Sequence, residues 1–110
     1  MTKQEIRQMI DETGIQNAYY QFEDGRELTP PWICFYYPES GDLYADDENY
    51  QYITSLTIEL YSPTRDFASE AAIEEVLKAH KIPWAKFESY ESDERLYMIS
   101  YETEVIINGD

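Results

Sequence analysis

The spacing of apolar residues predicts a helix near the N-terminus of the chain. Three apolar residues recur there at helical intervals: Ile6, Met9 and Ile10. Thr2 and Glu5 form a capping-box pattern, in which each side chain binds a backbone amide of the first helical turn. Gly14 supplies a residue suited to the left-handed conformation that ends many helices. We therefore predict a helix over residues 3–13.

A second helix is predicted between Asp66 and Pro83. Asp66 is a favourable N-cap, and Pro83 cannot continue a helix. The apolar residues assigned to the buried stripe are Ala68, Ala72, Ile73, Val76 and Leu77. The acidic residues assigned to the outer face are Glu70, Glu74 and Glu75. Lys78 and Lys81 lie near the C-terminal end, where the helix dipole favours positive charge.

Alternation with a period of two predicts strands, most clearly over residues 50–61. One face of that strand carries Tyr52, Leu56, Ile58 and Leu60, and the other carries Gln51, Ser55, Thr57 and Glu59. The other predicted strands cover residues 17–22, 32–37, 84–91 and 96–107. The 32–37 strand is aromatic and aliphatic throughout, so we expect both of its faces to be covered. Residues 92–95 join the last two strands as a hairpin.

The resulting element order is α-β-β-β-α-β-β. It predicts a single α+β domain over residues 1–110, with a largely antiparallel β-sheet and two helices packed on one face. Residues 39–49 follow neither period and are rich in acids, so we expect an exposed acidic loop there. Within it, Leu43 and Tyr44 form an apolar pair ringed by acids, which is typical of a contact tip.

The net charge of the chain limits the kinds of molecule that it can bind. The chain has 23 acidic and 8 basic residues, for a formal net charge of -15. This balance argues against specific binding of nucleic acid and against an anionic membrane, because phosphate neutralisation needs a Lys/Arg surface. It favours a basic protein partner or a protein that mimics nucleic acid. The eleven tyrosines suit half-buried strands and protein interfaces.

The number of cysteines and the length of the apolar runs indicate the cellular compartment of the protein. Cys34 is the one cysteine, so no internal disulfide can form, which favours a reducing environment. The first residues lack the pattern of a signal peptide, and no apolar run reaches the length of a membrane span. We therefore expect the protein to be made and kept in the cytoplasm.

The residues that could carry chemistry form no convincing catalytic set. His80 is the one histidine and lies near a helix end, and Cys34 lies in an apolar strand without a base nearby in sequence. Glu102 and Glu104 project from the same side of a solvated strand, where nothing raises the pKa of either carboxyl. The acids of the 39–49 loop lack the spacing of a calcium loop. We expect no catalytic, cofactor-binding or metal site, and no enzyme.

The order of these segments resembles a known family. The segments that carry the resemblance are Gly14-Ile15, Ala18-Tyr19-Tyr20, Pro30-Pro31, the acidic run from Ala45 to Tyr50, Ile58-Glu59-Leu60-Tyr61, Ile82-Pro83 and the 88–102 hairpin. Together they are similar, over nearly the whole chain, to tail terminator or tail-completion proteins. These proteins belong to long-tailed, siphovirus-type phages and prophages of Gram-positive bacteria.

The resemblance implies a virion structural protein without catalytic residues. Members form a homo-oligomeric ring, commonly a hexamer, that caps the tail tube and joins it to the head connector. The implied partners are therefore the tail tube protein and the head–tail connector protein. The implied location is the head–tail junction of the virion, with the host cytoplasm during assembly. The family loop that reaches the ring lumen or a neighbour corresponds here to Asp42, Leu43, Tyr44, Asp46 and Asp47.

Two other functions compete with this one. The net charge also fits an acidic phage inhibitor or nucleic-acid mimic that occupies the basic groove of a host protein, although the acids are scattered along the sequence. A neighbouring neck protein, such as a head completion factor, is also a small ring-forming subunit. An enzyme is the weakest alternative, and it would need His80 close to Cys34 or to a buried acid.

Overall fold

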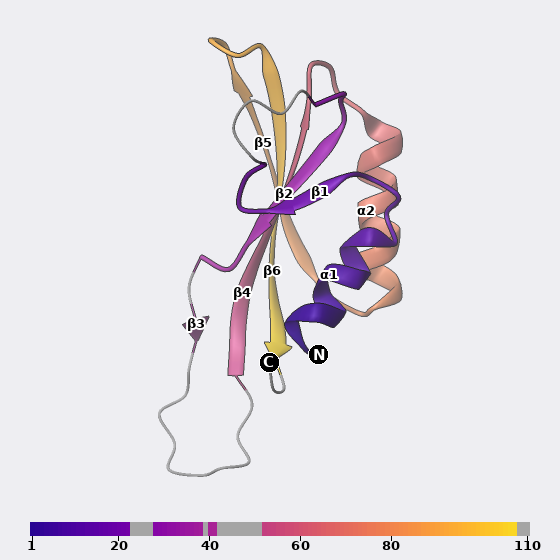
Figure 1. Ribbon diagram of the computed structural model, residues 1–110, viewed down its shortest axis with the longest axis vertical. Helices are drawn as coiled ribbons and strands as arrows, with labels where there is room; N and C mark the ends of the chain where they lie inside the picture. The colour runs from indigo at the N-terminus through magenta and orange to yellow at the C-terminus, as the bar shows by residue number, and fades with distance from the viewer. Residues whose placement is uncertain (23–27, 39, 42–51, 108–110) are drawn as a thin grey trace.

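The computed structural model contains one β-sheet with two helices on one of its faces (Figure 1). It describes residues 1–22, 28–38, 40–41 and 52–107. The helices are α1 (Lys3–Asp11) and α2 (Phe67–Ala79). The strands are β1 (Asn17–Tyr19), β2 (Trp32–Tyr36), β3 (Ser40–Gly41), β4 (Tyr52–Ser62), β5 (Trp84–Glu91) and β6 (Leu96–Ile107).

The sheet is mixed and mostly antiparallel. Its five main strands lie in the order β1-β2-β4-β6-β5, and the short β3 pairs with β4 beside this path. β1 runs parallel to β2, and the other pairs are antiparallel. The α+β class and the order α-β-β-β-α-β-β predicted from the sequence are therefore confirmed. β1 and β5 form the two opposite edges of the sheet.

Both helix caps form as their sequences predict. Thr2 accepts a hydrogen bond from the Glu5 amide at 3.1 Å, and the Glu5 carboxylate accepts one from the Thr2 amide at 2.9 Å. Asp66 accepts from the Ser69 amide at 3.0 Å. These bonds satisfy amide groups that have no partner inside the helix. The positive φ of Gly14, 76°, then turns the chain away from α1 toward β1.

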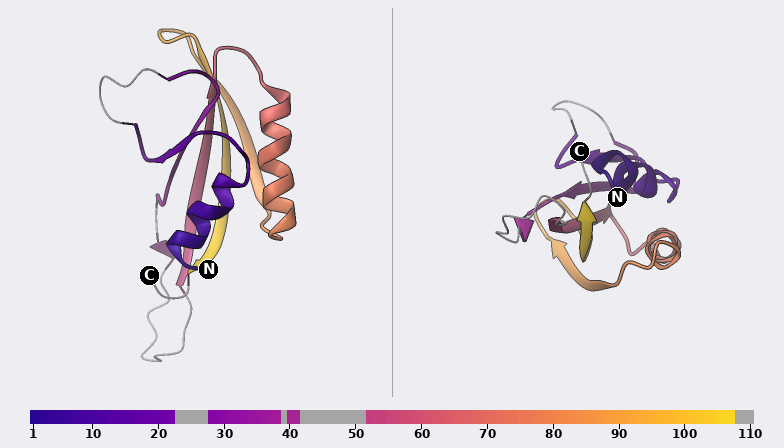
Figure 2. Two further views of the ribbon diagram at one scale, coloured as in Figure 1. Left: turned by 45° about the vertical axis from the view of Figure 1, so that its right-hand side comes forward. Right: turned by 90° about the horizontal axis from the view of Figure 1, so that it is seen from below.

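The hydrophobic core lies between the helices and one face of the sheet. Figure 2 shows α1 and α2 on the same side of the strands. The core residues from the helices are Ile6, Met9, Ile10, Ile73 and Leu77. Those from the sheet include Ile33, Phe35, Leu56, Ile58, Leu60, Ile99 and Tyr101. We call this side the helix face and the opposite side the outer face.

The outer face is not covered by a described helix, yet several of its residues are buried. Cys34 is 6% exposed, and Thr57 and Ser100 are similarly buried. Cys34 lies between Trp32 and Tyr36 along β2, so large neighbouring side chains shield it. The expectation that both faces of this strand are covered holds at Cys34 but not at its two ends, because Trp32 and Tyr36 are only partly buried. Thr57 belongs to the polar face of the strand predicted over residues 50–61, which the alternation predicts to be solvated, and its burial shows that this prediction is wrong at Thr57.

Several predicted boundaries differ from the structure. The strand predicted over residues 32–37 ends at Tyr36, and the one predicted over residues 50–61 ends at Ser62. The first helix ends at Asp11 instead of residue 13. The first strand ends at Tyr19 instead of residue 22, because Tyr20 has a φ of 68° and leaves the extended conformation. Ser40–Gly41 forms a short strand inside the segment predicted as a loop, because backbone pairing with Ile53 and Thr54 extends the sheet there.

Three burial assignments on α2 are also wrong. Glu74, assigned to the outer face of the helix, is partly buried and contacts the sheet residues Tyr101 and Lys86. Ala68, assigned to the buried stripe, is exposed, and Glu70, assigned to the outer face of the helix, is 2% exposed. Ile73 and Leu77 are buried as predicted. Glu70 lies three and seven residues before them and so shares their side of the helix. Its burial depends on the charged partners described next.

Candidate interaction surfaces

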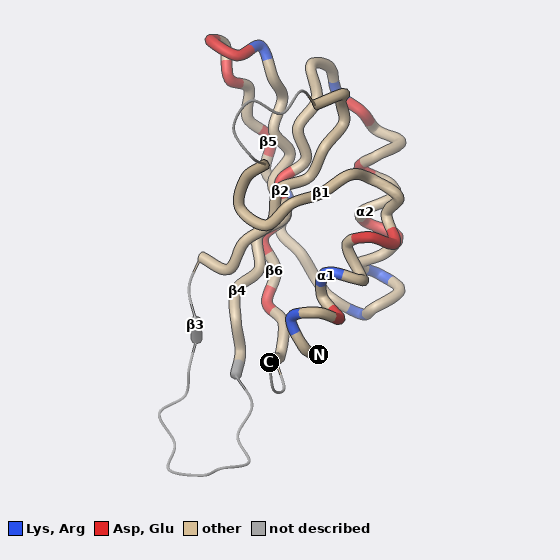
Figure 3. The backbone as a smooth tube through the Cα atoms, in the orientation of Figure 1, with Lys and Arg blue, Asp and Glu red and all other residues tan. Residues whose placement is uncertain are grey.

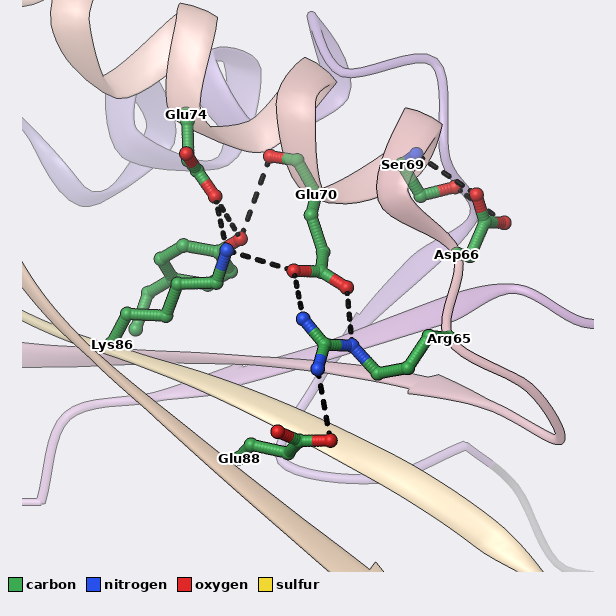
Figure 4. Close-up of polar contacts among 8 residues, drawn as sticks. Arg65, Asp66, Ser69, Glu70, Glu74, Lys86 and Glu88 are labelled. Atoms are coloured by element: carbon green, nitrogen blue, oxygen red, sulfur yellow. Dashed lines mark hydrogen bonds and ion pairs between the residues drawn. The ribbon is translucent and has the colours of Figure 1, made fainter.

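A network of charged side chains fixes the edge strand β5 to α2 (Figure 4). Arg65, just before α2, donates from Nε and Nη2 to the two carboxylate oxygens of Glu70, both at 3.0 Å. Lys86, on β5, approaches Glu70 at 2.8 Å and Glu74 at 2.7 Å. Arg65 also reaches Glu88 on β5 at 2.9 Å. The two cations therefore bridge the helix and the edge strand at several points.

The network keeps the buried Glu70 carboxylate ionised. Burial raises its pKa, but hydrogen bonds from Arg65 and Lys86 outweigh burial and hold the pKa below its usual range. The same bonds raise the pKa of Lys86. Tyr101 donates to Glu74 at 2.8 Å, and burial together with this bond raises the pKa of the tyrosine. The network is a structural device that holds β5 in place.

The first candidate interaction surface is the β5 edge. β5 pairs with β6 on one side, and no described strand pairs with its other side. Phe87 and Tyr90 on this strand are 52% and 50% exposed. The Tyr90 ring packs against the Tyr97 ring at a centroid distance of 4.8 Å. The strand thus presents unpaired backbone groups and two aromatic rings to solvent.

The turn that follows β5 is acidic, as Figure 3 shows at the end of the β5–β6 hairpin. Its acids are Glu91, Asp93 and Glu94, all exposed. None of them forms an ion pair within the part of the chain that the structure describes. Arg95 is the one basic residue of the turn. We call Tyr90 to Glu94 the hairpin tip.

The second candidate surface is the β1 edge, where Tyr19 and Tyr20 are 50% and 64% exposed. Beside it lies a shallow hollow of about 520 Å³. Its lining residues are Lys3, Gln4, Arg7, Tyr19, Phe35 and Tyr37. We call this the basic hollow. It combines two cations with three aromatic rings on a strongly acidic chain.

Contacts within the basic hollow hold the aromatic and cationic groups together. The Tyr19 ring contacts the rings of Phe35 and Tyr37 at centroid distances of 5.5 and 5.7 Å. Lys3 Nζ lies 5.9 Å from the Tyr37 ring centre, and Arg7 Cζ lies 5.7 Å from that of Phe35. These distances fit cation–π contacts. Neither cation has an ion-pair partner among the described residues.

The outer face carries a third surface. The register of β4 and β6 places three carboxylates of these strands on it: Glu59, Glu102 and Glu104. Glu59 accepts hydrogen bonds from Tyr36 at 3.1 Å and Tyr61 at 2.9 Å. Glu102 and Glu104 line an open depression of about 640 Å³ together with Tyr36 and Trp84. The prediction that Glu102 and Glu104 share a solvated side is confirmed.

The two nucleophile or base candidates lie on different sides of the sheet. Cys34 is on the outer face, and burial, followed by the nearby Glu59 charge, raises the pKa of its thiol to about 11. His80 caps α2 on the helix side, and its Nε2 lies 3.1 Å from a carboxylate oxygen of the exposed Glu12. They therefore cannot form a Cys-His pair. Among the described residues, no group of three His, Cys, Asp or Glu has the arrangement of a metal site.

The loop residues predicted to contact a partner, Asp42, Leu43, Tyr44, Asp46 and Asp47, lie outside the described residues. The basic hollow and the β5 edge were not anticipated from the sequence. The sequence contained one indication of the basic hollow. Lys3 and Arg7 are four residues apart and so share one side of α1. Their proximity to Tyr19 and Tyr37 required the tertiary fold.

A comparison with protein-family models and with curated proteins finds no match for this chain. Among the described residues, neither helix combines the length and apolar character required to cross a bilayer. The assignment of function therefore depends on the surfaces described above and on the resemblance of the sequence segments.

Proposed function

We propose that this chain is a ring-forming subunit of a siphovirus-type phage tail, acting as a tail terminator or tail-completion protein. One observation carries the proposal. The two opposite edges of the sheet each expose a pair of aromatic residues, Tyr19 with Tyr20 and Phe87 with Tyr90. A contact that joins one edge of a subunit to the other edge of the next repeats head to tail and can close into a ring.

The physical chemistry of β5 supports an assembly role. An eight-residue edge strand with exposed aromatic rings is prone to pair with another chain unless something covers it. Aromatic residues are also enriched at protein interfaces, where the ring loses contact with water. The charged network around Glu70 holds this strand in a defined position before any partner arrives. A preordered edge lowers the entropy lost on association.

In this role the mechanism is geometric. The ring adds to the last ring of the tail tube, ends its polymerisation and offers its opposite surface to the head connector. The net charge of -15 suits a passage for DNA, because like charge prevents adhesion to the phosphate backbone. The assignment of Asp42, Leu43, Tyr44, Asp46 and Asp47 to the lumen or to a neighbour remains a prediction.

The test is the solution mass across a wide range of protein concentrations, with and without Mg²⁺, followed by electron microscopy. We expect closed rings, alone or on the ends of tubes formed by the tube protein, and shorter tubes when the chain is added. The variant Phe87→Ser should weaken ring formation. Ile53→Ser is the matched control, since Ile53 is 37% exposed but lies on β4 with a paired strand on each side. A chain that neither oligomerises nor shortens tubes would overturn the proposal.

The outer face supports a second candidate, binding to a basic host protein. Glu102 and Glu104 lie side by side near Tyr36 and Trp84, an arrangement that can receive an arginine-rich segment. An arginine-rich peptide should then bind the native chain, and Glu102→Gln with Glu104→Gln should abolish that binding. Binding that the double variant retains, or that is absent from the native chain, would exclude this candidate.

A further inference from the structure

We propose that the hairpin tip of one subunit docks in the basic hollow of the next copy of the same chain. This inference depends on the proposed function, because it names the two surfaces that would join subunits within the ring. The occupant of the basic hollow is thus a second copy, and the contact is head to tail.

The basic hollow has the chemistry of a receptor for an acidic aromatic segment. Lys3 and Arg7 are exposed, and within the described part of the chain neither forms an ion pair. Arg7 lies over the Phe35 ring, and among the described residues it makes one long hydrogen bond, to the Asn17 carbonyl at 3.4 Å. Asp11, one turn farther along α1, instead accepts a hydrogen bond from the Asn17 side-chain amide at 2.8 Å. Both cations therefore remain available to an external carboxylate.

The hairpin tip has the complementary chemistry. It presents three carboxylates without ion pairs among the described residues, next to the half-exposed Tyr90 ring. Tyr90 can pack against the rings of Tyr19 and Tyr37 while Asp93 and Glu94, in the turn after β5, approach the cations. Charge-assisted contacts next to aromatic packing provide both orientation and affinity.

The position of the two surfaces favours a second copy over an unrelated acidic partner. They belong to opposite edges of one sheet, β1 with α1 on one side and the β5–β6 hairpin on the other (Figure 1). Each subunit therefore carries one donor and one receptor. Complementary charge also selects this orientation, because two acidic surfaces facing each other would repel on a chain with net charge -15.

The test uses two charge-reversed variants of the full chain. One carries Lys3→Glu with Arg7→Glu, and the other carries Asp93→Lys with Glu94→Lys. Each variant alone should associate about tenfold more weakly than the native chain, since its two surfaces now have the same sign. An equimolar mixture should assemble again, because each reversed surface then meets a complementary one on the other variant.

Lys78→Glu with Lys81→Glu is the matched control for net charge, because both lysines are exposed near the end of α2 and outside the basic hollow. It should associate at least several-fold more strongly than the Lys3 and Arg7 variant. Circular dichroism establishes that each variant is folded. Solution mass and electron microscopy then report the assembly.

The outcomes separate this inference from the proposed function. If the native chain forms rings that neither reversal weakens, or if the mixture fails to recover assembly, the inference is wrong and ring formation uses other surfaces. If the mixture assembles but no product closes into rings or ends a tube, the contact is correct and the proposed function is wrong. A native chain that never associates overturns both.

Discussion

Glu70 shows how a single residue can reverse an expectation drawn from polarity alone. It shares a side of α2 with Ile73 and Leu77, and it is almost fully buried. Its carboxylate receives charged donors from Arg65 and Lys86, one on each side. A buried charge is tolerated when such partners replace the water that it loses. Substitution of Glu70 should therefore change the stability of the fold more than substitution of the exposed acids around it.

The substitution Glu70→Gln should lower the free energy of unfolding at neutral pH by about 2 kcal/mol, since Arg65 and Lys86 lose a charged partner but are exposed enough to regain water. Urea denaturation measures the change. Glu75→Gln is the control on the exposed side of the same helix, and it should alter stability by less than about 0.5 kcal/mol. Equal effects of the two substitutions would contradict the role assigned to the network.

The same carboxylate should contribute to the pH dependence of stability. Its pKa is lower in the folded chain than its ordinary value of 4.5. The folded state therefore binds fewer protons, so the stabilisation is present above that value and is lost as the pH falls through the folded pKa. The difference in stability between the native chain and Glu70→Gln should shrink as the pH falls below 4.5. A difference that stays constant with pH would count against this.

At the scale of elements, local hydrogen bonds determine where α1 begins, and contacts with residues far away in sequence determine where it lies in the fold. The capping box between Thr2 and Glu5 lies within one turn. The ammonium group of Met1 then donates to the Ile106 carbonyl at 2.9 Å, which ties the start of the helix to the end of β6. The first turn carries Lys3, so the cap also sets the position of one wall of the basic hollow.

Thr2→Ala should destabilise the chain by about 1 kcal/mol, because the Glu5 amide loses its acceptor. The Thr2 amide and hydroxyl also hold the pKa of Glu5 below its usual range. The substitution should therefore raise the pKa of Glu5, which NMR titration of the carboxyl group can follow. Thr64→Ala, at an exposed threonine outside any helix or strand, is the control and should leave both quantities unchanged. If Thr2→Ala altered neither the stability nor the pKa of Glu5, the Thr2 hydroxyl would not cap the helix in solution.

At the scale of the whole molecule, the large net negative charge destabilises the compact folded state. The net charge of -15 is spread over a chain of 110 residues, and few of the acids have a cationic partner in the described part. Repulsion among like charges raises the free energy of the folded state relative to the expanded one. A partner with positive charge, or a neighbouring copy that aligns opposite charges, would relieve part of this repulsion.

Raising NaCl from about 20 mM to about 200 mM should increase the free energy of unfolding by about 1 kcal/mol, because the screening length shortens. The measurement is urea denaturation at a protein concentration low enough to keep the chain monomeric. An uncharged solute at the same osmolality is the control and separates screening from solute exclusion. Stability that falls with salt would mean that attractive pairs outweigh the net repulsion.

The sequence by itself determined the element order and the alternation of faces. A capping box, the stop at Pro83 and the period-two run through Leu56, Ile58 and Leu60 are local signals, and local chemistry is enough to form them. The bounds of β5 and β6 were predicted correctly for the same reason. The loop proposed to face a partner, residues 42–47, stays a prediction because it lies outside the described residues.

Tertiary structure decided the properties that join residues far apart in the sequence. The burial of Glu70 depends on Lys86, sixteen positions later on another element, and the basic hollow depends on Tyr37 meeting α1. The placement of β1 and β5 at opposite edges follows from the strand order, which local periodicity does not encode. Pairing partners across a sheet are selected by packing of the whole chain, so the candidate surfaces became visible only in the folded molecule.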